Sequence, residues 1–472
     1  MRLLSLTSPA GLVFDEIFYA RIACRFVIDT AQCGIDNLVS GAHPPLGNWL
    51  IGIGIRLFGY DEFGWRIASA MAGTLSVALL YVLVRRLMAG HVPASAATVG
   101  ATAAAALLAT DFLDLVQSRV AMLDSFVTML VIAVVLLLTL DGRRRRGPRG
   151  EDLGAPRWLR RVSLGRPWRL AAGLALGSAV AVKWSGGYVA LGLIGLLVAW
   201  EVAAPMDGDD DRPNGRHASL SEAFRREAVP SLVLLGLVPV IVYVASYIGR
   251  VDGNLIALPW REGSVWRGIL EHQLAMLRFH LGLASDHPYE SAPWSWLLLE
   301  RPVAYSFASS AGTYREVLAI GNPLTWWPGA IALLGLGLRW VRAGGGLARP
   351  EVVLLVAALS TYLPWLVLSG SRSQVFIWYL LPTIPFLYGA LGLWAALAWS
   401  PLSGRIVIGL AAGAVVASFA FFYPVLTAAP LTPDAWRSRI WFTDCSRPGA
   451  PTLTVPNDEI DRGPPPSGWC WI

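Results

Sequence analysis

Long apolar segments dominate this 472-residue chain and set the limits on its fold. Ten of them can be recognised, at residues 63–87, 93–110, 120–140, 168–184, 186–204, 228–248, 323–341, 351–368, 374–398 and 404–424. Most are close to the roughly 20 residues that an α-helix needs to cross a bilayer. With 55% hydrophobic and only 15% charged residues, the composition agrees. The sequence therefore predicts an all-α polytopic membrane protein with about ten spans.

The arginines between these segments predict the orientation. Arg85 and Arg86 follow the first segment, many arginines lie between 143 and 169, and others stand near 225, 339–349 and 405. Basic residues in short loops mark the cytoplasmic side. The alternate connections, including residues 1–62, then face outward. An external N-terminus without an anchor is unusual, so we expect an upstream first span that is missing from this start, which gives eleven spans.

This reading divides the chain into five parts. They are an external catalytic first loop (1–62), the first half of the transmembrane bundle (63–248), a long external loop (249–322), the second half of the bundle (323–424) and an external C-terminal tail (425–472).

Charged residues gather at the predicted outer ends of the spans. They are Asp15, Glu16, Arg66, Arg119, Asp124, Lys183 and Arg372. Singly, each fits a role in topology or a side chain reaching the interface. Together they indicate a cavity for an anionic ligand, whose phosphate the cations suit and whose lipid tail the spans suit. Transfer of a group from a lipid phosphate is the chemistry that this pattern favours.

Several short motifs occur in a family-specific order. They are Phe14-Asp15-Glu16, His43-Pro44-Pro45-Leu46-Gly47, Gly64-Trp65-Arg66, Lys183-Trp184-Ser185-Gly186, His287-Pro288-Tyr289-Glu290-Ser291 and Trp441-Phe442-Thr443-Asp444-Cys445. The ordered set resembles the bacterial, actinobacterial-type polyprenol-phosphate-mannose–protein O-mannosyltransferases. The resemblance implies a C-type glycosyltransferase fold. It also implies transfer of mannose from polyprenyl-phosphate mannose to Ser or Thr hydroxyls of exported proteins, at the outer face of the cell membrane.

The resemblance also assigns roles at the site. Asp15 is expected to be the catalytic base in a direct displacement that inverts the sugar carbon, and Glu16 to orient the acceptor or to hold an arginine. Arg66 is the first choice for the donor phosphate, with Arg372 and Lys183 behind it. The family pattern demands no cofactor or metal, and it leaves room for a divalent ion between the two acids.

Other residues are expected to support the site. His43 precedes two prolines that stiffen a turn, so a structural role is favoured over a chemical one. Arg119 and Asp124 are expected to form an ion pair at the outer end. Trp294 and Trp296 either cover the site from the long loop or belong to an interfacial belt.

Two alternative functions stay open. One is transfer from the same kind of lipid donor to a glycolipid, because only the family motifs indicate a protein acceptor. The other is a transporter, which the crowding of ionisable residues at one face and the lack of a visible repeat disfavour. The expected partners are the lipid donor, membrane lipid and secreted or membrane proteins, reached through the export machinery, and not nucleic acid.

The four cysteines lie outside the apolar segments. Cys445 and Cys470 enclose a loop of the external tail, and an external location permits oxidation. We expect a Cys445–Cys470 disulfide, with Cys24 and Cys33 as rival partners.

Overall fold

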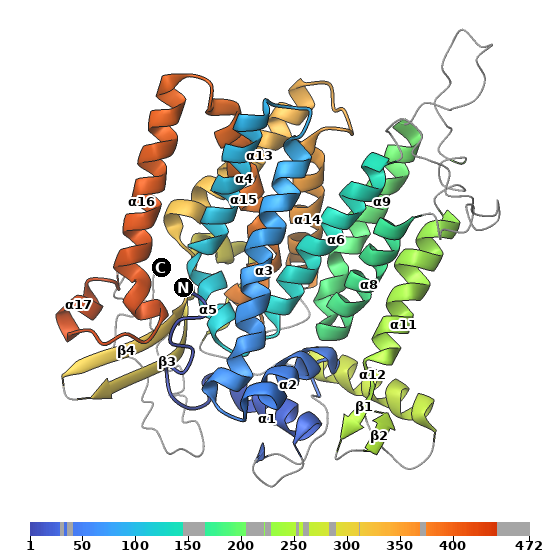
Figure 1. Cartoon of the computed structure of the whole chain (residues 1–472), viewed down its shortest axis with the longest axis vertical. Coiled ribbons are helices and arrows are strands. Elements are labelled where there is room, and N and C mark those ends of the chain that lie inside the picture. The colour runs from blue at the N-terminus through green and yellow to red at the C-terminus, as the bar shows by residue number, and fades with distance from the viewer. Residues whose placement is uncertain are drawn as a thin grey trace.

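The computed structural model describes residues 1–28, 33–34, 41–144, 166–203, 221, 228–251, 254–257, 264–282, 289–310, 312–368 and 374–440. It is a bundle of upright helices with smaller elements gathered at one end (Figure 1). The bundle is built from α3 (Glu62–Met88), α4 (Ala94–Ala109), α5 (Phe112–Arg119), α6 (Asp124–Arg144), α8 (Pro167–Val182), η2 (Trp184–Gly187), α9 (Tyr188–Ala203), η3 (Leu232–Leu237), α11 (Val238–Ala245), α13 (Pro323–Arg342), α14 (Pro350–Leu368), η6 (Ile377–Thr383), α15 (Ile384–Ala398) and α16 (Leu402–Leu426).

All ten apolar segments of the sequence are helical. Within the described part of the chain, seven helices are long and apolar enough to cross a membrane. They include α3, α6, α14 and α16. An eighth span results if α4 and α5, which meet at a bend of 56°, are counted as one. The multi-pass architecture is therefore confirmed, while the shorter α8, of 16 residues, and α13 lie outside this set.

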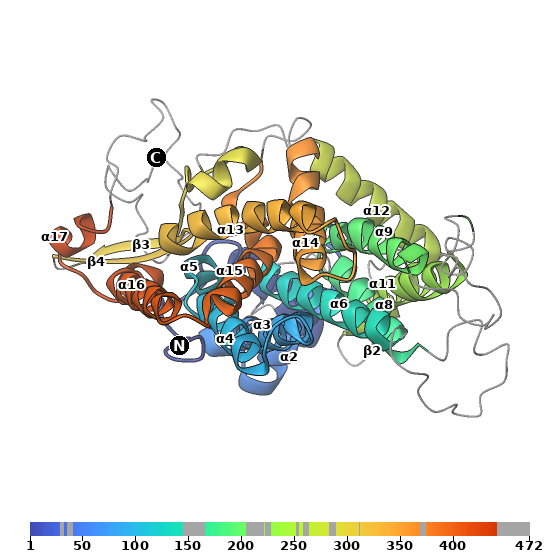
Figure 2. The same ribbon diagram turned by 90° about the horizontal axis from the view of Figure 1, so that it is seen from above.

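Close contact between α4 and α15 shows how small residues bring two of these helices together. A Cβ on Gly100 would lie 2.4 Å from the carbonyl oxygen of Gly392, and a Cβ on Gly392 would lie equally close to that of Gly100. Backbones can approach this closely only where a side chain is missing, which is how helices commonly pack in membranes. Seen from above, α4 and α15 lie next to each other within the bundle (Figure 2).

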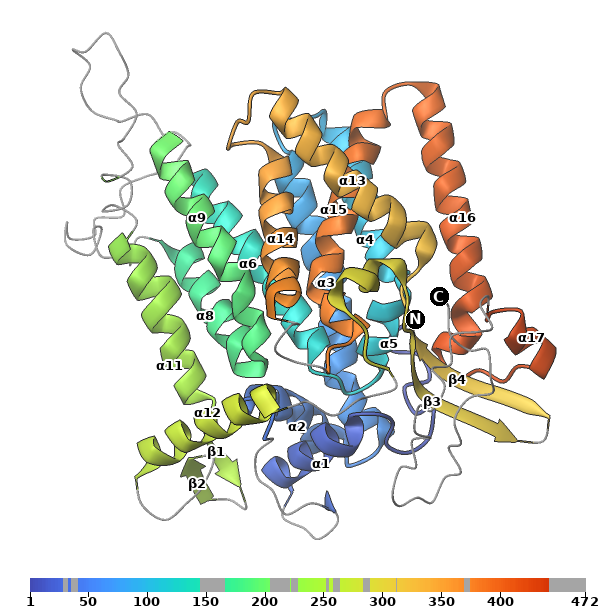
Figure 3. The ribbon, with the colours of Figure 1, turned by 180° about the vertical axis from the view of Figure 1, so that it is seen from behind.

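The basic ends of two helices lie at the same end of the bundle. Arg85 and Arg86 at the end of α3, and Arg339 and Arg342 at the end of α13, lie at the end of the bundle away from α1 and α2 (Figures 1 and 3). The first loop, the long loop and the segment after α16 lie together at the other end.

The sequence analysis missed most of the elements at that other end. They are α1 (Glu16–Val27), α2 (Leu46–Phe58), α12 (Val265–Gly282), η4 (Pro293–Leu298), α17 (Pro433–Arg437) and two antiparallel hairpins, β1 (Ile248–Val251) with β2 (Asn254–Ala257) and β3 (Val303–Ser310) with β4 (Thr313–Ala319). The expected helical fold is confirmed, and the loops add two short β-hairpins to it.

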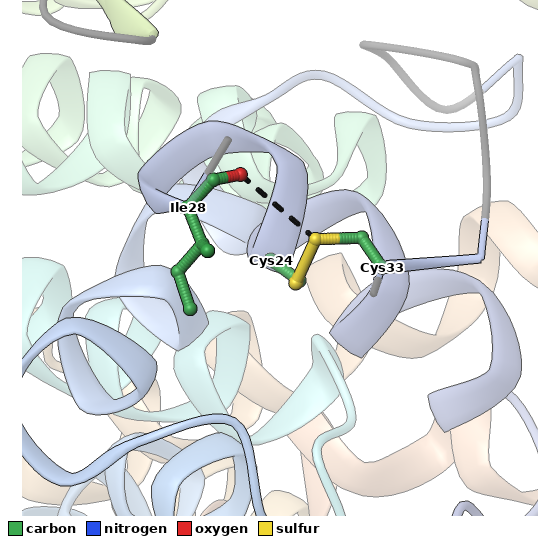
Figure 4. Close-up of a disulfide and its surroundings, with 3 residues drawn as sticks. All are labelled: Cys24, Ile28 and Cys33. Carbon is green, nitrogen blue, oxygen red and sulfur yellow. Dashed lines mark hydrogen bonds between the residues drawn. A yellow bond between two sulfur atoms is a disulfide. The ribbon is translucent and has the colours of Figure 1, made fainter. Parts of the chain in front are cut away.

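A disulfide closes the C-terminal end of α1. Cys24 is bonded to Cys33, and both side chains are buried (Figure 4). This bond excludes Cys24 and Cys33 as partners for the tail cysteines. Cys445 and Cys470 lie outside the described residues, so their bond stays a prediction.

Candidate active site

The two acids of the first loop stand where the chain enters α1. Asp15 occupies the N-cap position, and Glu16 is the first residue of the helix. Just before them, Phe14 has a φ of +49°, which is an uncommon and strained conformation for a bulky residue. Its ring stacks on Tyr305 of β3 with 4.2 Å between the centroids. Packing against the long loop therefore holds the strained turn that sets the direction of both acids.

The guanidinium group of Arg66 in α3 has all of its hydrogen bonds within the protein. Its Nε and Nη2 donate to the two carboxylate oxygens of Glu16, at 2.8 and 2.9 Å. The remaining N–H groups donate to the carbonyls of Leu6 (2.8 Å), Pro9 (2.7 Å) and Gly11 (2.9 Å). A guanidinium has five N–H donors, and all five have acceptors here. With no donor left for a phosphate, Arg66 serves in this structure as a link between α3 and the first loop, and the phosphate role expected for it stays a prediction.

Glu16 is equally enclosed. Besides the two bonds from Arg66, its oxygens accept from the backbone N–H groups of Val13 and Ala121, each at 2.9 Å. The carboxylate and the guanidinium are both completely buried. A carboxylate with four such donors is held as a structural anion. Of the two roles expected for Glu16, the structure has the arginine-holding one.

Asp15 has a different environment, although it is the adjacent residue. Its side chain is half-buried, and burial raises its pKa to about 6. The positive charge of Lys183 acts against that rise, the negative charge of Asp124 adds to it, and a hydrogen bond from the Tyr19 hydroxyl lowers the pKa again. A carboxylate with a pKa near 6 is largely ionised at neutral pH and still a useful proton acceptor.

Lys183 is the predicted cation that lies beside Asp15. It follows the last residue of α8, and its Nζ donates to both oxygens of Asp124, at 2.9 and 3.1 Å. The same Nζ stands 4.3 Å from the centroid of the Tyr379 ring. Asp124, which begins α6, is thus paired with Lys183 and not with Arg119 as the sequence analysis expected.

Arg119 donates hydrogen bonds to backbone carbonyls and not to Asp124. Its Nη1 donates to the carbonyls of Met1 (3.2 Å) and Leu4, and its Nη2 to that of Ser5 (2.9 Å). The acid expected to pair with it is already neutralised by a lysine, and the nearby main chain supplies acceptors in its place. Arg119 therefore positions the first residues of the chain.

The remaining predicted residues fall into three groups. His43 is buried near Tyr19 and His280, with ring centroids 6.0 and 5.8 Å away. Trp296 is fully buried and donates to Ser291, whereas Trp294 is 64% exposed. The two tryptophans therefore do not act as a pair. Arg372 lies outside the described residues.

Two tyrosines of the site were not predicted from the sequence. Tyr19 stands one helical turn after Asp15, a spacing that puts the two side chains on one face and that could have been noticed. Tyr305 stacks on Phe14 and accepts a 2.5 Å hydrogen bond from Gln117. The sequence carries no local signal for that contact, because 188 positions separate Gln117 from Tyr305. Burial raises the pKa of both tyrosines, which keeps them neutral as hydrogen-bond donors.

Metal ligands do not gather in the described part of the chain. No group of three or more His, Cys, Asp or Glu residues there could hold a metal ion. Asp15 and Glu16 in particular diverge, since Glu16 is turned into its pair with Arg66.

Comparison with known proteins shows the family of the chain. Residues 42–148 match the family model of dolichyl-phosphate-mannose-protein mannosyltransferases, and residues 265–445 match that of the C-terminal four-transmembrane region of protein O-mannosyltransferases. The chain is 32% identical to the polyprenol-phosphate-mannose–protein mannosyltransferase of Mycobacterium tuberculosis, over 93% of this chain and 87% of that one. It is 28% identical to the protein of the same name from Corynebacterium glutamicum, over 93% and 89%.

A solved structure has the same fold. The S. cerevisiae protein O-mannosyltransferase Pmt1-Pmt2 complex bound to the sugar donor matches with a TM-score of 0.69 and 17% identity, over 93% of this chain and 90% of that one. The fold is that of the C-type glycosyltransferases. With relatives above 30% identity that it matches almost from end to end, the chain belongs to the polyprenol-phosphate-mannose–protein mannosyltransferase family of glycosyltransferases.

Proposed function

We propose that this chain transfers mannose from polyprenyl-phosphate mannose to Ser or Thr hydroxyls of exported proteins, with Asp15 as the catalytic base. The observation that carries the proposal is the contrast in the first loop. Glu16 is sealed by Arg66, while Asp15 is half-buried, has its pKa raised to about 6 and lies beside Lys183. The names of the curated relatives supply the donor and the protein acceptor.

The reaction needs one base and one stabilised leaving group. Asp15 takes the proton of the acceptor hydroxyl as the hydroxyl oxygen bonds to the anomeric carbon of mannose. The bond from that carbon to the phosphate oxygen breaks, and the phosphate leaves with the electron pair. A positioned base contributes about 10²–10⁴-fold. Attack opposite the leaving group inverts the carbon, so a β-linked donor gives an α-mannoside.

Lys183 is the candidate cation for the leaving phosphate. Its ammonium group neutralises Asp124 in the structure and acts electrostatically on Asp15, so it stands close to the base. A phosphate placed there gains a charge-assisted hydrogen bond, which stabilises the charge that develops as the donor bond breaks. Arg372 is a second candidate.

The site is proposed to face the outside of the cell membrane. The basic helix ends of α3 and α13 lie at the opposite end of the bundle and mark the cytoplasmic side. The Cys24–Cys33 disulfide next to the site fits an oxidising, extracytoplasmic compartment. Acceptors would then arrive unfolded as they leave the export machinery.

The test is a transfer assay with membranes that contain the protein. Labelled polyprenyl-phosphate mannose is supplied with a Ser/Thr-rich peptide in one reaction and with a glycolipid acceptor in another. We expect mannose on the peptide, in α linkage. Transfer to the glycolipid alone would favour the alternative acceptor class, and a lack of transfer by folded protein to either would reject the activity.

A further inference from the structure

A basic groove lies at the end of the bundle opposite Asp15. It is an open cavity of about 660 Å³ between the C-terminal end of α13, the turn into α14 and the side of α15. Its lining residues are Gly335, Leu338, Arg339, Arg342, Ala343, Arg349 and Trp394. No part of the proposed transfer reaction uses this groove.

Positive charge exceeds negative charge in the groove. The carboxylate of Glu351 accepts from Arg339 and, at 3.0 Å, from Arg349. That pairing draws the two guanidinium groups from α13 and the α14 turn together over one buried acid. A third arginine, Arg342, is exposed and forms no ion pair among the described residues. One carboxylate for three guanidinium groups leaves the groove positively charged.

The pairing also leaves hydrogen-bonding capacity unused. The Nε of Arg349 is buried, and it has no acceptor in the described part of the structure. The Oε2 of Glu351 is likewise buried without a donor there, so these two atoms belong to one incompletely closed ion pair, and it is the excess of positive charge in the groove that calls for an anion. An anion with several oxygens would supply acceptors for more than one guanidinium group at once.

One wall of the groove faces lipid. Leu338 is 59% exposed, and Leu334 and Ile331, one and two turns earlier on α13, are 71% and 70% exposed. In a membrane helix such apolar exposure faces acyl chains. Trp394 on the opposite wall is 37% exposed and donates its indole N–H to the carbonyl of Ala332. The arginines therefore stand at headgroup level above an apolar surface.

We propose that this groove binds the phosphate of an anionic phospholipid from the leaflet opposite the active site. The headgroup phosphate is placed between Arg342 and the Arg339–Glu351–Arg349 cluster, and an acyl chain lies along Leu338 and Leu334. A basic pocket between membrane helices at headgroup depth is the usual architecture for recognising an anionic lipid. A free phosphate shares the charge chemistry, but it makes no use of the apolar wall.

The experiment compares two charge reversals at the same end of the bundle. Arg342→Glu changes the groove without unpairing buried Glu351. Arg405→Glu is the matched control, since Arg405 donates to the Trp399 carbonyl and is not among the groove residues. The purified full-length protein in detergent is mixed with equal amounts of short-chain phosphatidylglycerol and phosphatidylcholine, and bound lipids are counted by native mass spectrometry.

We expect the wild type and Arg405→Glu to retain phosphatidylglycerol in preference to phosphatidylcholine. Arg342→Glu should bind phosphatidylglycerol roughly tenfold more weakly, because a charge-assisted contact is replaced by repulsion. Equal retention by the two variants, or no preference in the wild type, overturns the proposal. Displacement of the lipid by inorganic phosphate at equal concentration overturns the lipid as the source of the phosphate.

Discussion

Asp15 and Glu16 are adjacent carboxylates with opposite surroundings. Glu16 accepts four hydrogen bonds and is completely buried against Arg66. Asp15 is half-buried and interacts electrostatically with Lys183 and Asp124. Its pKa is raised to about 6. A carboxylate whose lone pairs are all filled cannot take a proton from a substrate, whereas a partly exposed one with a raised pKa can. Two consecutive positions of the chain therefore hold one fully enclosed acid and one partly accessible acid.

Replacing Asp15 should give the largest effect on activity. Asp15→Asn keeps the shape but cannot accept the proton, so we expect transfer to fall by about 10²–10⁴-fold. The measurement is the labelled-mannose assay, with a melting curve to show that the protein is folded. Asp434→Asn, in α17, is the control and should be active. More than a tenth of wild-type turnover in a folded Asp15→Asn protein would reject Asp15 as the base.

Removing the ion pair between Arg66 and Glu16 should lower the stability of the folded protein. Arg66→Ala leaves Glu16 buried and unpaired, and such losses cost about 3–5 kcal/mol. We expect a much lower melting temperature and poor yield from membranes. Arg267→Ala is the matched control, since its ion pair with Glu271 is 80% exposed on the arginine side and should contribute little. A stable Arg66→Ala protein with weakened donor affinity alone would restore Arg66 to the phosphate site.

Opening the disulfide should have a moderate effect. Cys33→Ser removes a cross-link between residues nine positions apart, which contributes on the order of 2–3 kcal/mol in the chain-entropy model. We expect a lower melting temperature, and wild-type protein under reducing conditions should match it. The variant itself should be insensitive to reductant. If reductant lowers the melting temperature of Cys33→Ser as well, a second disulfide is present, and the tail cysteines become its candidates.

The smallest expected effect is a change in the pH dependence of transfer when Asp124 is replaced. Asp15 acts as a base only when ionised, so transfer should rise with pH through about 6 and then level off. Asp124 raises the pKa of Asp15, so Asp124→Asn should move this limb to lower pH, by less than about one unit. The measurement is the pH profile of kcat/KM, with Asp434→Asn as control. If the acidic limb of this profile moves to higher pH in Asp124→Asn, then Asp124 acts on Asp15 chiefly by holding Lys183 in position.

The sequence predicted the bundle better than the site. Hydrophobic segments and arginine-rich connections depend on local composition, and all ten apolar segments are helical. Pairing at the site depends on which side chains meet in space. Arg66, Arg119 and Lys183 are alike as cations at span ends, and only the fold shows that the first two hold the N-terminal segment while the third pairs with Asp124.

The external elements show the same limit. α12 and the β3–β4 hairpin lie in a loop without a long apolar segment, and they were not predicted. Tyr305 reaches Phe14 only because that hairpin folds over the first loop. The family resemblance indicated the order of motifs but not these contacts.

The first eleven residues are held in large part through their main chain, although the side chains of Arg2, paired with Asp114, and of Leu6 are also buried. Arg66 and Arg119 take the carbonyls of Met1, Leu4, Ser5, Leu6, Pro9 and Gly11. Every residue has the same backbone carbonyl. These hydrogen bonds therefore depend on the spacing of the peptide groups along the chain and little on the identity of the side chains. Such a stretch can drift in sequence between relatives while its length is kept. In a mutational scan, single replacements there, other than at the buried Arg2 and Leu6, should be tolerated more often than the deletion of one residue between positions 4 and 9, which would displace the carbonyls on one side of the deletion from their arginine.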